Sequence, residues 1–424
     1  MRLSLSFLHT PPKISFAELI LIGLTVLAVS IGWYARLSNL DFPQHFVFDE
    51  SIYIPVARDF VAVKHHLHDH PALSSMLFAL GLAEFDGTPL GWRLMPALMG
   101  LIAQISIPWA AYKLFKLRSA ALIAAIWVAI DPMFAAYSRL VLPDLLIVVL
   151  QALALGYAWN KKPSPLVLGL ILGLAAAVKM NGAFIIAPIL ILLMYRRQFV
   201  LALATLCCGA LSYASVALLA ELAMASPQPL QDALEWQKFS WHFHSTLIQE
   251  HPWGSRWYTW PLLLVPVRIY QYIDGLQTYY SIISLPNPPL LWLSTVSLLS
   301  APFVFARTFW QKHRPSWTLP FSFLALAALI NWLAWSQIER LSFWYHYFPS
   351  YTFLLIGMAG LLAHSWNKAS ARLQLLILIF LGLSVVSGIY FLPLGTASPL
   401  NQGQYQNRQL LESWQYPGKF LYKP

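Results

Sequence analysis

The sequence predicts an all-α polytopic membrane protein with a single integral domain. Hydrophobic residues make up 58% of the 424 residues and charged residues only 10%, and the mean hydropathy is +0.60. A soluble chain of this length needs a far more charged surface. Long apolar runs separated by short basic clusters complete the pattern, which excludes a water-soluble globular protein.

The basic residues lie in clusters between the apolar runs, with two runs between successive clusters. Positive residues gather in cytoplasmic loops, so this spacing places all five clusters on the cytoplasmic side. Nucleic-acid binding would instead require basic residues along one face, and we expect no nucleic-acid partner despite the net charge of +10. The clusters are Lys113, Lys116 and Arg118; Lys161 and Lys162; Arg196 and Arg197; 307–314; and 368–372.

Hydropathy predicts about eleven transmembrane helices, with a cytoplasmic N-terminus and an external C-terminus. The first run contains Ala28, Val29 and Ser30, small residues that a signal peptide could use. Its length and the balanced topology downstream favour a retained helix. The predicted spans are 17–35, 94–112, 119–136, 142–159, 164–178, 183–195, 198–222, 289–305, 317–335, 347–366 and 373–392.

No linker or internal repeat divides residues 1–424 into separate domains. Within this one domain, residues 1–222 form an N-terminal half with an outer loop at 37–92. Residues 223–424 form a C-terminal region of four helices with an outer segment at 223–288. The pair Cys207 and Cys208 lies in an apolar span and has neither a disulfide framework nor metal-ligand spacing.

Two adjacent acids begin the stretch "FDESIYIPVARDF" at residues 48–60. Residues 48–70 have the apolar spacing of short amphipathic helices that lie in the membrane interface. From spacing alone, Asp49 and Glu50 are more often solvated residues of a first helical turn, where the helix dipole favours carboxylates. The alternative is a functional site at the membrane surface.

The stretch "KHHLHDHPAL" at residues 64–73 is rich in histidine. Alternation of His66, His68 and His70 could present three imidazoles to zinc, but no defined fourth ligand follows. Interfacial, partly protonated histidines are the favoured interpretation. We therefore predict no required cofactor; a divalent metal has no support from the sequence.

Three charges lie near the ends of predicted spans and need partners, because charges are costly at bilayer depth. A salt bridge between Arg139 and Asp144 would close the turn between the third and fourth helices. Lys179 either extends toward the interface or meets a lipid phosphate.

Several motifs, in order, resemble the protein O-mannosyltransferase family. The first half contains Phe48-Asp49-Glu50, Asp69-His70-Pro71-Ala72-Leu73, Gly91-Trp92-Arg93 with Pro96 and Gly100, and Ser138-Arg139 with Asp144. The second half contains "HSTLIQEHPWGSRWYTWPLLLVPVRIY" (244–270), "LPNPPLLW" (285–292) and "FWYHYFPSYTF" (343–353). Each motif is weak alone, but their order and their location at outer turns are specific.

This resemblance implies a GT-C fold and an inverting glycosyltransferase that uses a polyprenyl-phosphate sugar, with mannose the expected sugar. Asp49 would be the catalytic base, and its neighbour Glu50 would take part in binding acceptor or donor. Donor or phosphate binding would involve Arg36, Arg139 and Asp144, and Lys179, Arg256 and Arg268 are cationic candidates by position. Asp69, His70 and Arg93 are further candidates from the matched motifs.

The chain departs from the family pattern after His70. The family usually has His-Pro-Pro-Leu-Gly-Lys, whereas this chain has His70-Pro71-Ala72-Leu73-Ser74-Ser75, without the lysine. The segment 223–288 is also too short for the soluble β-domain of eukaryotic relatives. These departures favour a bacterial plasma-membrane enzyme with an extracytoplasmic site, and they leave a protein hydroxyl and a lipid or glycan acceptor open, the latter as in the related aminoarabinose transferases.

Two other functional classes fit the sequence less well. A transporter or flippase would show inverted repeats and polar residues in the middle of its spans, whereas the notable charges here cluster at outer turns. An inactive structural subunit is disfavoured by the intact Asp49, Glu50 and Arg139. The expected partners are therefore a lipid-linked sugar, an acceptor and membrane lipids.

Overall fold

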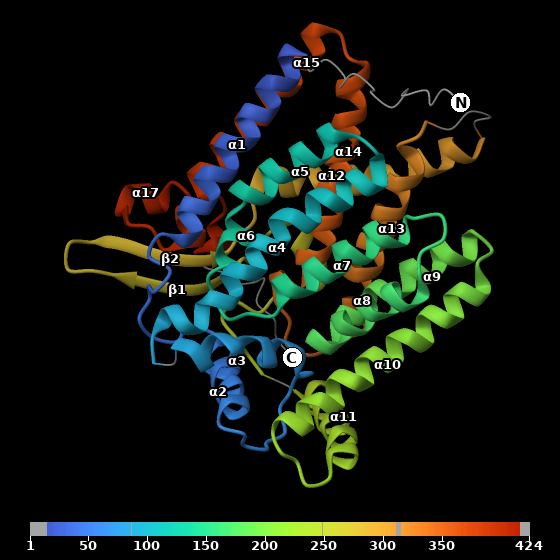
Figure 1. Ribbon diagram of the computed structural model, residues 1–424. Coiled ribbons are helices and arrows are strands. Elements are labelled where there is room, and N and C mark those ends of the chain that lie inside the picture. The colour runs from blue at the N-terminus through green and yellow to red at the C-terminus, as the bar shows by residue number, and fades with distance from the viewer. Residues whose placement is uncertain (1–14, 86, 248, 311–314, 416–424) are drawn as a thin grey trace, which may run out of the picture.

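The computed structural model describes residues 15–85, 87–247, 249–310 and 315–415 (Figure 1). Seven of its helical segments are long and apolar enough to cross a membrane. The long helices are α1 (Phe16–Leu37), α4 (Pro89–Phe115), α10 (Phe199–Ala223), α12 (Pro288–Trp310), α13 (Thr318–Leu333), α14 (Phe348–Lys368) and α15 (Ala371–Phe391). Residues 311–314 of the fourth basic cluster lie outside the described residues.

Shorter apolar helices correspond to the remaining predicted spans. They are α5 (Arg118–Ile130), α7 (Asp144–Ala158), α8 (Pro165–Val178) and α9 (Ile186–Tyr195), the last preceded by the 3-10 turn η1 (Met180–Ile185). The prediction of a helical membrane protein is therefore confirmed.

The third predicted span is interrupted. Asp131 ends α5, and its carboxylate accepts a hydrogen bond from the backbone N–H of Met133 at 2.9 Å. Pro132 then occupies the first position of the short helix α6 (Pro132–Tyr137), where a missing N–H costs nothing. The span 119–136 thus divides into two helices at an Asp-Pro step.

Small residues bring α8 and α10 into close contact. A Cβ atom added to Gly173 would lie 2.4 Å from the carbonyl oxygen of Gly209, and one added to Gly169 would lie 2.4 Å from the Cβ of Cys208. Membrane helices pack tightly through such residues because lipid supplies no hydrophobic drive for association. Cys208 is therefore a packing residue of this contact.

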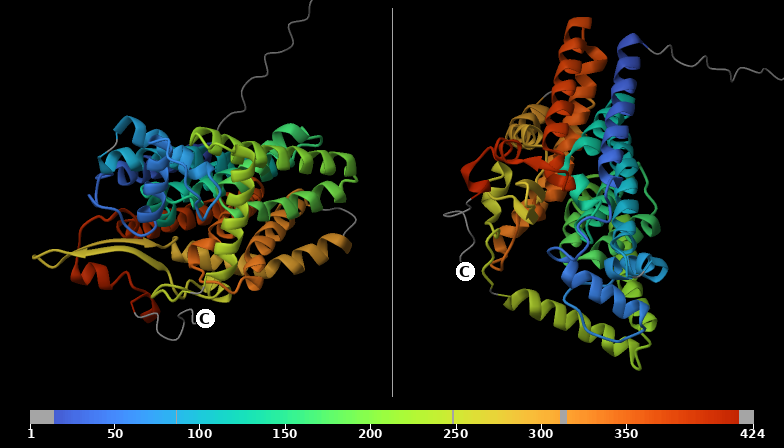
Figure 2. Two further views of the ribbon diagram at one scale, coloured as in Figure 1. Left: turned by 90° about the horizontal axis from the view of Figure 1, so that it is seen from below. Right: turned by 90° about the vertical axis from the view of Figure 1, so that its left-hand side faces the viewer.

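Three helices lie together at one end of the bundle, the lower end in Figure 1: α2 (Glu50–Val61), α3 (Leu73–Phe85) and α11 (Pro229–Thr246). The expected helical stretch at 48–70 is shorter than predicted, because residues 64–70 form no helix. α11 lies across the base of the bundle (Figure 2, right).

A small antiparallel sheet was not predicted. Strands β1 (Val267–Ile273) and β2 (Thr278–Ser284) form a hairpin that projects from the bundle (Figures 1 and 2), and β3 (Leu400–Asn401) pairs with β2. The Asp274 carboxylate closes the turn by accepting from the N–H groups of Leu276 and Thr278. The remaining short elements are η2 (Trp257–Leu262), η3 (Ala334–Gln337), η4 (Trp344–Tyr347), α16 (Pro393–Thr396), α17 (Gln402–Gln406) and η5 (Glu412–Trp414).

Candidate active site

The two adjacent acids have opposite environments. Phe48 adopts a left-handed backbone conformation with φ of 53°, which is uncommon for a residue with a bulky side chain. Asp49 follows at the N-cap of α2, is half-buried, and makes no capping hydrogen bond through its side chain. Glu50, the first residue of the helix, is fully buried.

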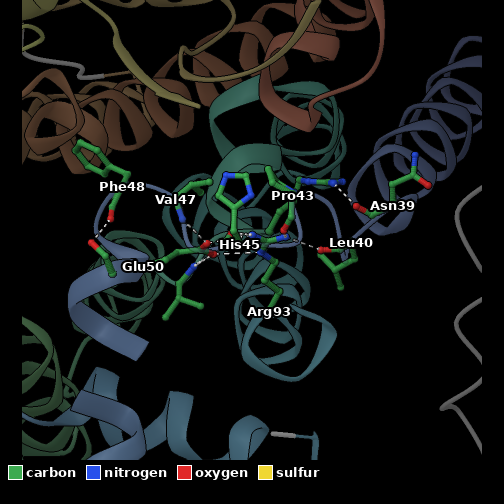
Figure 3. Close-up of polar contacts among 11 residues, drawn as sticks. Asn39, Leu40, Pro43, His45, Val47, Phe48, Glu50 and Arg93 are labelled. Atoms are coloured by element: carbon green, nitrogen blue, oxygen red, sulfur yellow. Dashed lines mark hydrogen bonds and ion pairs between the residues drawn. The ribbon is translucent and has the colours of Figure 1, made fainter. Parts of the chain in front are cut away.

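Glu50 forms a buried ion pair with Arg93 of α4 (Figure 3). The guanidinium donates to both carboxylate oxygens, at 3.0 and 3.2 Å. The backbone N–H groups of Val47 and Val141 also donate to Glu50, at 3.1 and 3.2 Å. With four donors around it, Glu50 is held in place and does not line the cavity described below, contrary to its expected role in binding acceptor or donor.

Two buried arginines fix the chain that leads to Asp49. Arg93 donates to the carbonyl oxygens of Leu40, Pro43 and His45 (Figure 3). Arg139 donates to those of Ala35, Arg36, Ser38 and Asn39, at 2.7 to 3.1 Å. A cation is favourable at these carbonyls because the C-terminus of α1 carries a partial negative charge.

The predicted salt bridge between Arg139 and Asp144 is therefore wrong. The Arg139 guanidinium is directed to backbone carbonyls, and its place in phosphate binding is not supported by its contacts. Asp144 instead lies 3.5 Å from the ammonium group of Lys179, with both side chains nearly buried. Lys179 follows the end of α8 and lies over the ring of Tyr345 at 5.4 Å.

Asp49 lines a cavity of about 360 Å³ at the end of the bundle. The walls come from segments far apart in the sequence: the start of α2, the loop before α3, the turn after α8, the end of α11 and the segment before α14. The polar side chains among them are Asp49, Tyr53, Asp69, His70, Lys179, His244, Gln249, His251, Arg340, Tyr345 and His346.

A chain of three side chains crosses this cavity. Arg340 lies 2.6 Å from Nδ1 of His244, and Nε2 of His244 lies 2.9 Å from Nδ1 of His70. Because a guanidinium can only donate, His244 must accept at Nδ1 and donate from Nε2 to His70. The ring proton of His70 is then on Nε2, and the donor and acceptor of both hydrogen bonds are fixed.

Burial sets the protonation of these groups. It raises the pKa of Asp49 to about 6, against the opposing charge of Lys179, and it raises the pKa of Asp69. It lowers the pKa of His244 to about 3 and that of His70 well below its usual value. Both histidines are therefore neutral at pH 7, as the hydrogen-bonded chain requires.

Asp69, His70 and His244 present ligand atoms within 4.8 Å of one another, a spacing that a metal ion could use. Both ring nitrogens of His244 are already engaged, one by Arg340 and the other by His70. Lys179 and Arg340 also place two positive charges in the same cavity, and Arg340 touches one of the three residues directly, so this donor set does not fit a resident cation.

Two further hollows continue from the cavity. A space of about 590 Å³ shares His70, Lys179, His244 and Arg340 with it. A more apolar groove of about 700 Å³, lined mainly by α8, η1, α10 and α11, meets that space at Met180 and Trp241. A polar cavity with two cations thus opens toward an apolar groove between helices.

The structure brings together four of the predicted site residues, Asp49, Asp69, His70 and Lys179, around one cavity. Besides Arg139, described above, three other cations proposed for the donor do not line it. Arg36 is buried against the carbonyl of Val128. Arg256 is exposed. Arg268 packs on the Trp253 ring at 4.7 Å and donates to the carbonyl of Trp414 at 3.3 Å.

Arg340 and His244 were missed as site residues. Arg340 stands three residues before the motif at 343–353, at the outer end of a predicted span. The positional argument that selected Lys179 would have selected it too. His244 begins the motif at 244–270, but nothing in the sequence indicates its contact with His70.

Comparisons with known proteins identify the family of this chain. The family model for dolichyl-phosphate-mannose-protein mannosyltransferase matches residues 69–227. A second model, the C-terminal four-transmembrane region of protein O-mannosyltransferase, matches residues 229–414. The two models describe successive parts of one family and leave few residues between 69 and 414 unmatched. The fold and the site define a membrane-embedded transferase of the GT-C type, and the chain belongs to the protein O-mannosyltransferase family.

Similar curated proteins include the polyprenol-phosphate-mannose–protein mannosyltransferases of Mycobacterium tuberculosis and Mycolicibacterium smegmatis. Each is 22% identical, and the alignments cover 93% and 92% of this chain and 91% and 92% of those proteins. The Saccharomyces cerevisiae protein O-mannosyltransferase complex bound to its sugar donor has a similar fold, with a TM-score of 0.73 at 14% identity over 96% of both chains. ArnT from Cupriavidus metallidurans has a TM-score of 0.57 at 16% identity, over 89% of this chain and 76% of its own.

Proposed function

We propose that this protein transfers mannose from a polyprenyl monophosphate to a protein Ser or Thr hydroxyl at the extracytoplasmic face of the membrane. The observation that carries the proposal is the shared cavity, which the half-buried carboxylates of Asp49 and Asp69 line together with two cations. The names of the similar curated proteins supply the donor and the acceptor class. The five basic clusters, expected in the cytoplasm, support the location.

Asp49 is the base of this reaction. As the acceptor oxygen attacks the anomeric carbon, its proton passes to the Asp49 carboxylate, the bond from that carbon to the phosphate oxygen breaks, and polyprenyl phosphate leaves with the electron pair. The configuration at the carbon inverts. A base with a pKa of about 6 is deprotonated at pH 7 yet basic enough to accept the proton.

Lys179 and Arg340 are the cations that neutralise the departing phosphate. Both line the cavity with Asp49, and each is oriented by a neighbour, Lys179 by Asp144 and Arg340 by His244. Charges placed in advance in a water-poor site stabilise a developing anion strongly. This pair takes over the role of the family lysine that is absent at Ser75.

The apolar groove suits the lipid part of the donor. Its lining includes Leu172, Ala176, Ile186 and Leu206, and few of its surface atoms are polar. It adjoins the polar space that contains Lys179 and Arg340. A prenyl chain in this groove would place its phosphate beside both cations.

The test is transfer by the purified full-length protein with three donors: polyprenyl monophosphate mannose, polyprenyl monophosphate glucose and a nucleotide-activated mannose. A Ser/Thr-rich peptide and a glycolipid serve as alternative acceptors, and Asp49→Asn is the matched inactive control. We expect a mannosylated peptide from the first donor only. Transfer from the nucleotide sugar without a lipid carrier would overturn the proposal, and transfer to the glycolipid alone would overturn the acceptor class.

A further inference from the structure

A second cluster of ionisable side chains lies outside the cavity, where three segments meet. His65 comes from the loop between α2 and α3, Glu221 from the last turn of α10, and Asp232 from the first turn of α11. Nε2 of His65 lies 2.9 Å from Oε2 of Glu221 and 3.8 Å from Oδ2 of Asp232. None of the three lines the cavity that contains Asp49 or the space beside it.

Glu221 provides a second, independent observation. Its side chain is fully buried, and its Oε1 atom has no hydrogen-bond partner among the described residues. A buried carboxylate oxygen without a partner costs free energy. The hydrogen bond from His65 satisfies only the other oxygen. A cation would replace the proton of that hydrogen bond and would also meet the unsatisfied oxygen.

We propose that His65, Glu221 and Asp232 bind a divalent transition-metal ion of the zinc type. The ligand atoms of the three residues lie within 4.8 Å of one another. Neighbouring ligands of tetrahedral zinc, at bond lengths of about 2.0 to 2.1 Å, are roughly 3.4 Å apart. The separations from Nε2 of His65 to the carboxylate oxygens of Glu221 and Asp232, 2.9 and 3.8 Å, lie on either side of this value.

The chemistry of the three side chains also suits such an ion. A neutral imidazole with two carboxylates carries two negative charges, which matches a dication, and water can complete a three-residue zinc site. Ser226 donates through its hydroxyl to Oδ2 of Asp232. Ligating carboxylates generally receive such orienting hydrogen bonds.

Bound metal would join the segment 62–72 to α10 and α11. That segment contains Asp69 and His70, and the last turn of α11 contains His244, so the ion would hold the two sides of the His70–His244 contact together. The zinc set considered from the sequence is different and does not form. His68 instead packs against Trp236, with Nε2 3.8 Å from Asp59.

The experiment measures zinc bound by the full-length protein, purified through a tag without histidine. Protein is treated with a chelator, freed of it, titrated with zinc chloride, and analysed for bound zinc by elemental mass spectrometry and for Tm. The variants are His65→Asn and Asp232→Asn, and the matched control is His66→Asn, which changes the exposed neighbouring histidine.

We expect one equivalent of zinc on the wild-type protein and on His66→Asn, and a rise in Tm of both with zinc, because an ion that binds only the folded state stabilises it. His65→Asn and Asp232→Asn should each bind more weakly by more than about tenfold, since even changes to outer-shell partners cost about that much. Absence of tight zinc binding by the wild-type protein would overturn the proposal. Equal zinc affinity of the wild-type protein and Asp232→Asn would also overturn the proposal. Because Asn has the same shape as Asp, Asp232→Asn provides the test even if His65→Asn does not fold.

Discussion

Asp49 and Glu50 are neighbours in the chain, yet they belong to two regions with different tasks. Glu50 lies in a buried network with Arg93, near the carbonyls that Arg139 holds, where every charge has a fixed partner. Asp49 faces a cavity, and no ion pair within 4 Å joins it to another described residue. The comparison shows how a site can combine a rigid frame with a reactive carboxylate. Glu50 holds the frame in place through its ion pair, and Asp49 remains available for chemistry.

The largest effect on activity is expected from Asp49→Asn. The amide keeps the shape of the side chain but cannot accept the proton, so the transfer rate should fall by roughly 10³-fold, within the range for loss of a general base. Tm should change little, because the Asp49 side chain caps no helix. Asp41→Asn, an exposed acid in the same loop, is the control. Near-normal transfer by Asp49→Asn would remove Asp49 from the role of base.

Lys179→Met should have the next largest effect. Loss of one fixed charge that stabilises a developing anion costs about 10²-fold in rate, and the apparent KM for the donor should rise more than that for the acceptor. Lys161→Met, at an exposed position between α7 and α8, should behave as wild type. An unchanged donor KM together with an unchanged rate would show that the phosphate does not lie near Lys179.

Glu50→Gln tests the frame rather than the chemistry. Breaking a buried ion pair leaves Arg93 uncompensated and costs about 3–5 kcal/mol of stability, so the main change should appear in the unfolding midpoint. Folded protein should retain transfer within about tenfold of wild type, since Glu50 does not line the cavity. Full stability with activity as low as in Asp49→Asn would assign Glu50 to the reaction itself.

The smallest effect is expected from Arg268→Gln. Sequence reasoning selected Arg268 as a donor-binding cation, but the structure places it against Trp253 and Trp414. The donor KM should change by less than about twofold, whereas Lys179→Met changes it strongly. A large, donor-specific KM increase in Arg268→Gln would restore it to the site.

The sequence predicts the spans well because hydropathy and helix length depend on local composition. It fails where one side chain decides the outcome, as at Asp131 and Pro132, which divide a span. The small sheet in the outer segment 223–288 was missed because buried and less buried residues alternate only from Val267 to Ile269, too short a stretch to indicate a strand.

Within the site, the family resemblance identified Asp49 and His70, and position at an outer turn identified Lys179; these three residues share a cavity. Position at an outer turn cannot reveal which way a side chain points. Arg139 lies at such a turn but points to the carbonyls of α1, so Asp144 pairs with Lys179 instead. The contact of Arg340 with His244 joins segments distant in sequence and leaves no local pattern.

The most direct test of the account is the pH dependence of kcat/KM for polyprenyl monophosphate mannose, measured with wild type and with Asp69→Asn. Burial raises the pKa of Asp49 to about 6, and the base works only when deprotonated. Activity should therefore be constant above that pH and fall about tenfold per pH unit below it. The midpoint should persist in Asp69→Asn but move to lower pH, because the negative charge of Asp69 helps to raise the pKa of Asp49. A flat profile between pH 5 and 7, or a midpoint that disappears with Asp69, would contradict the assignment of Asp49 as the base.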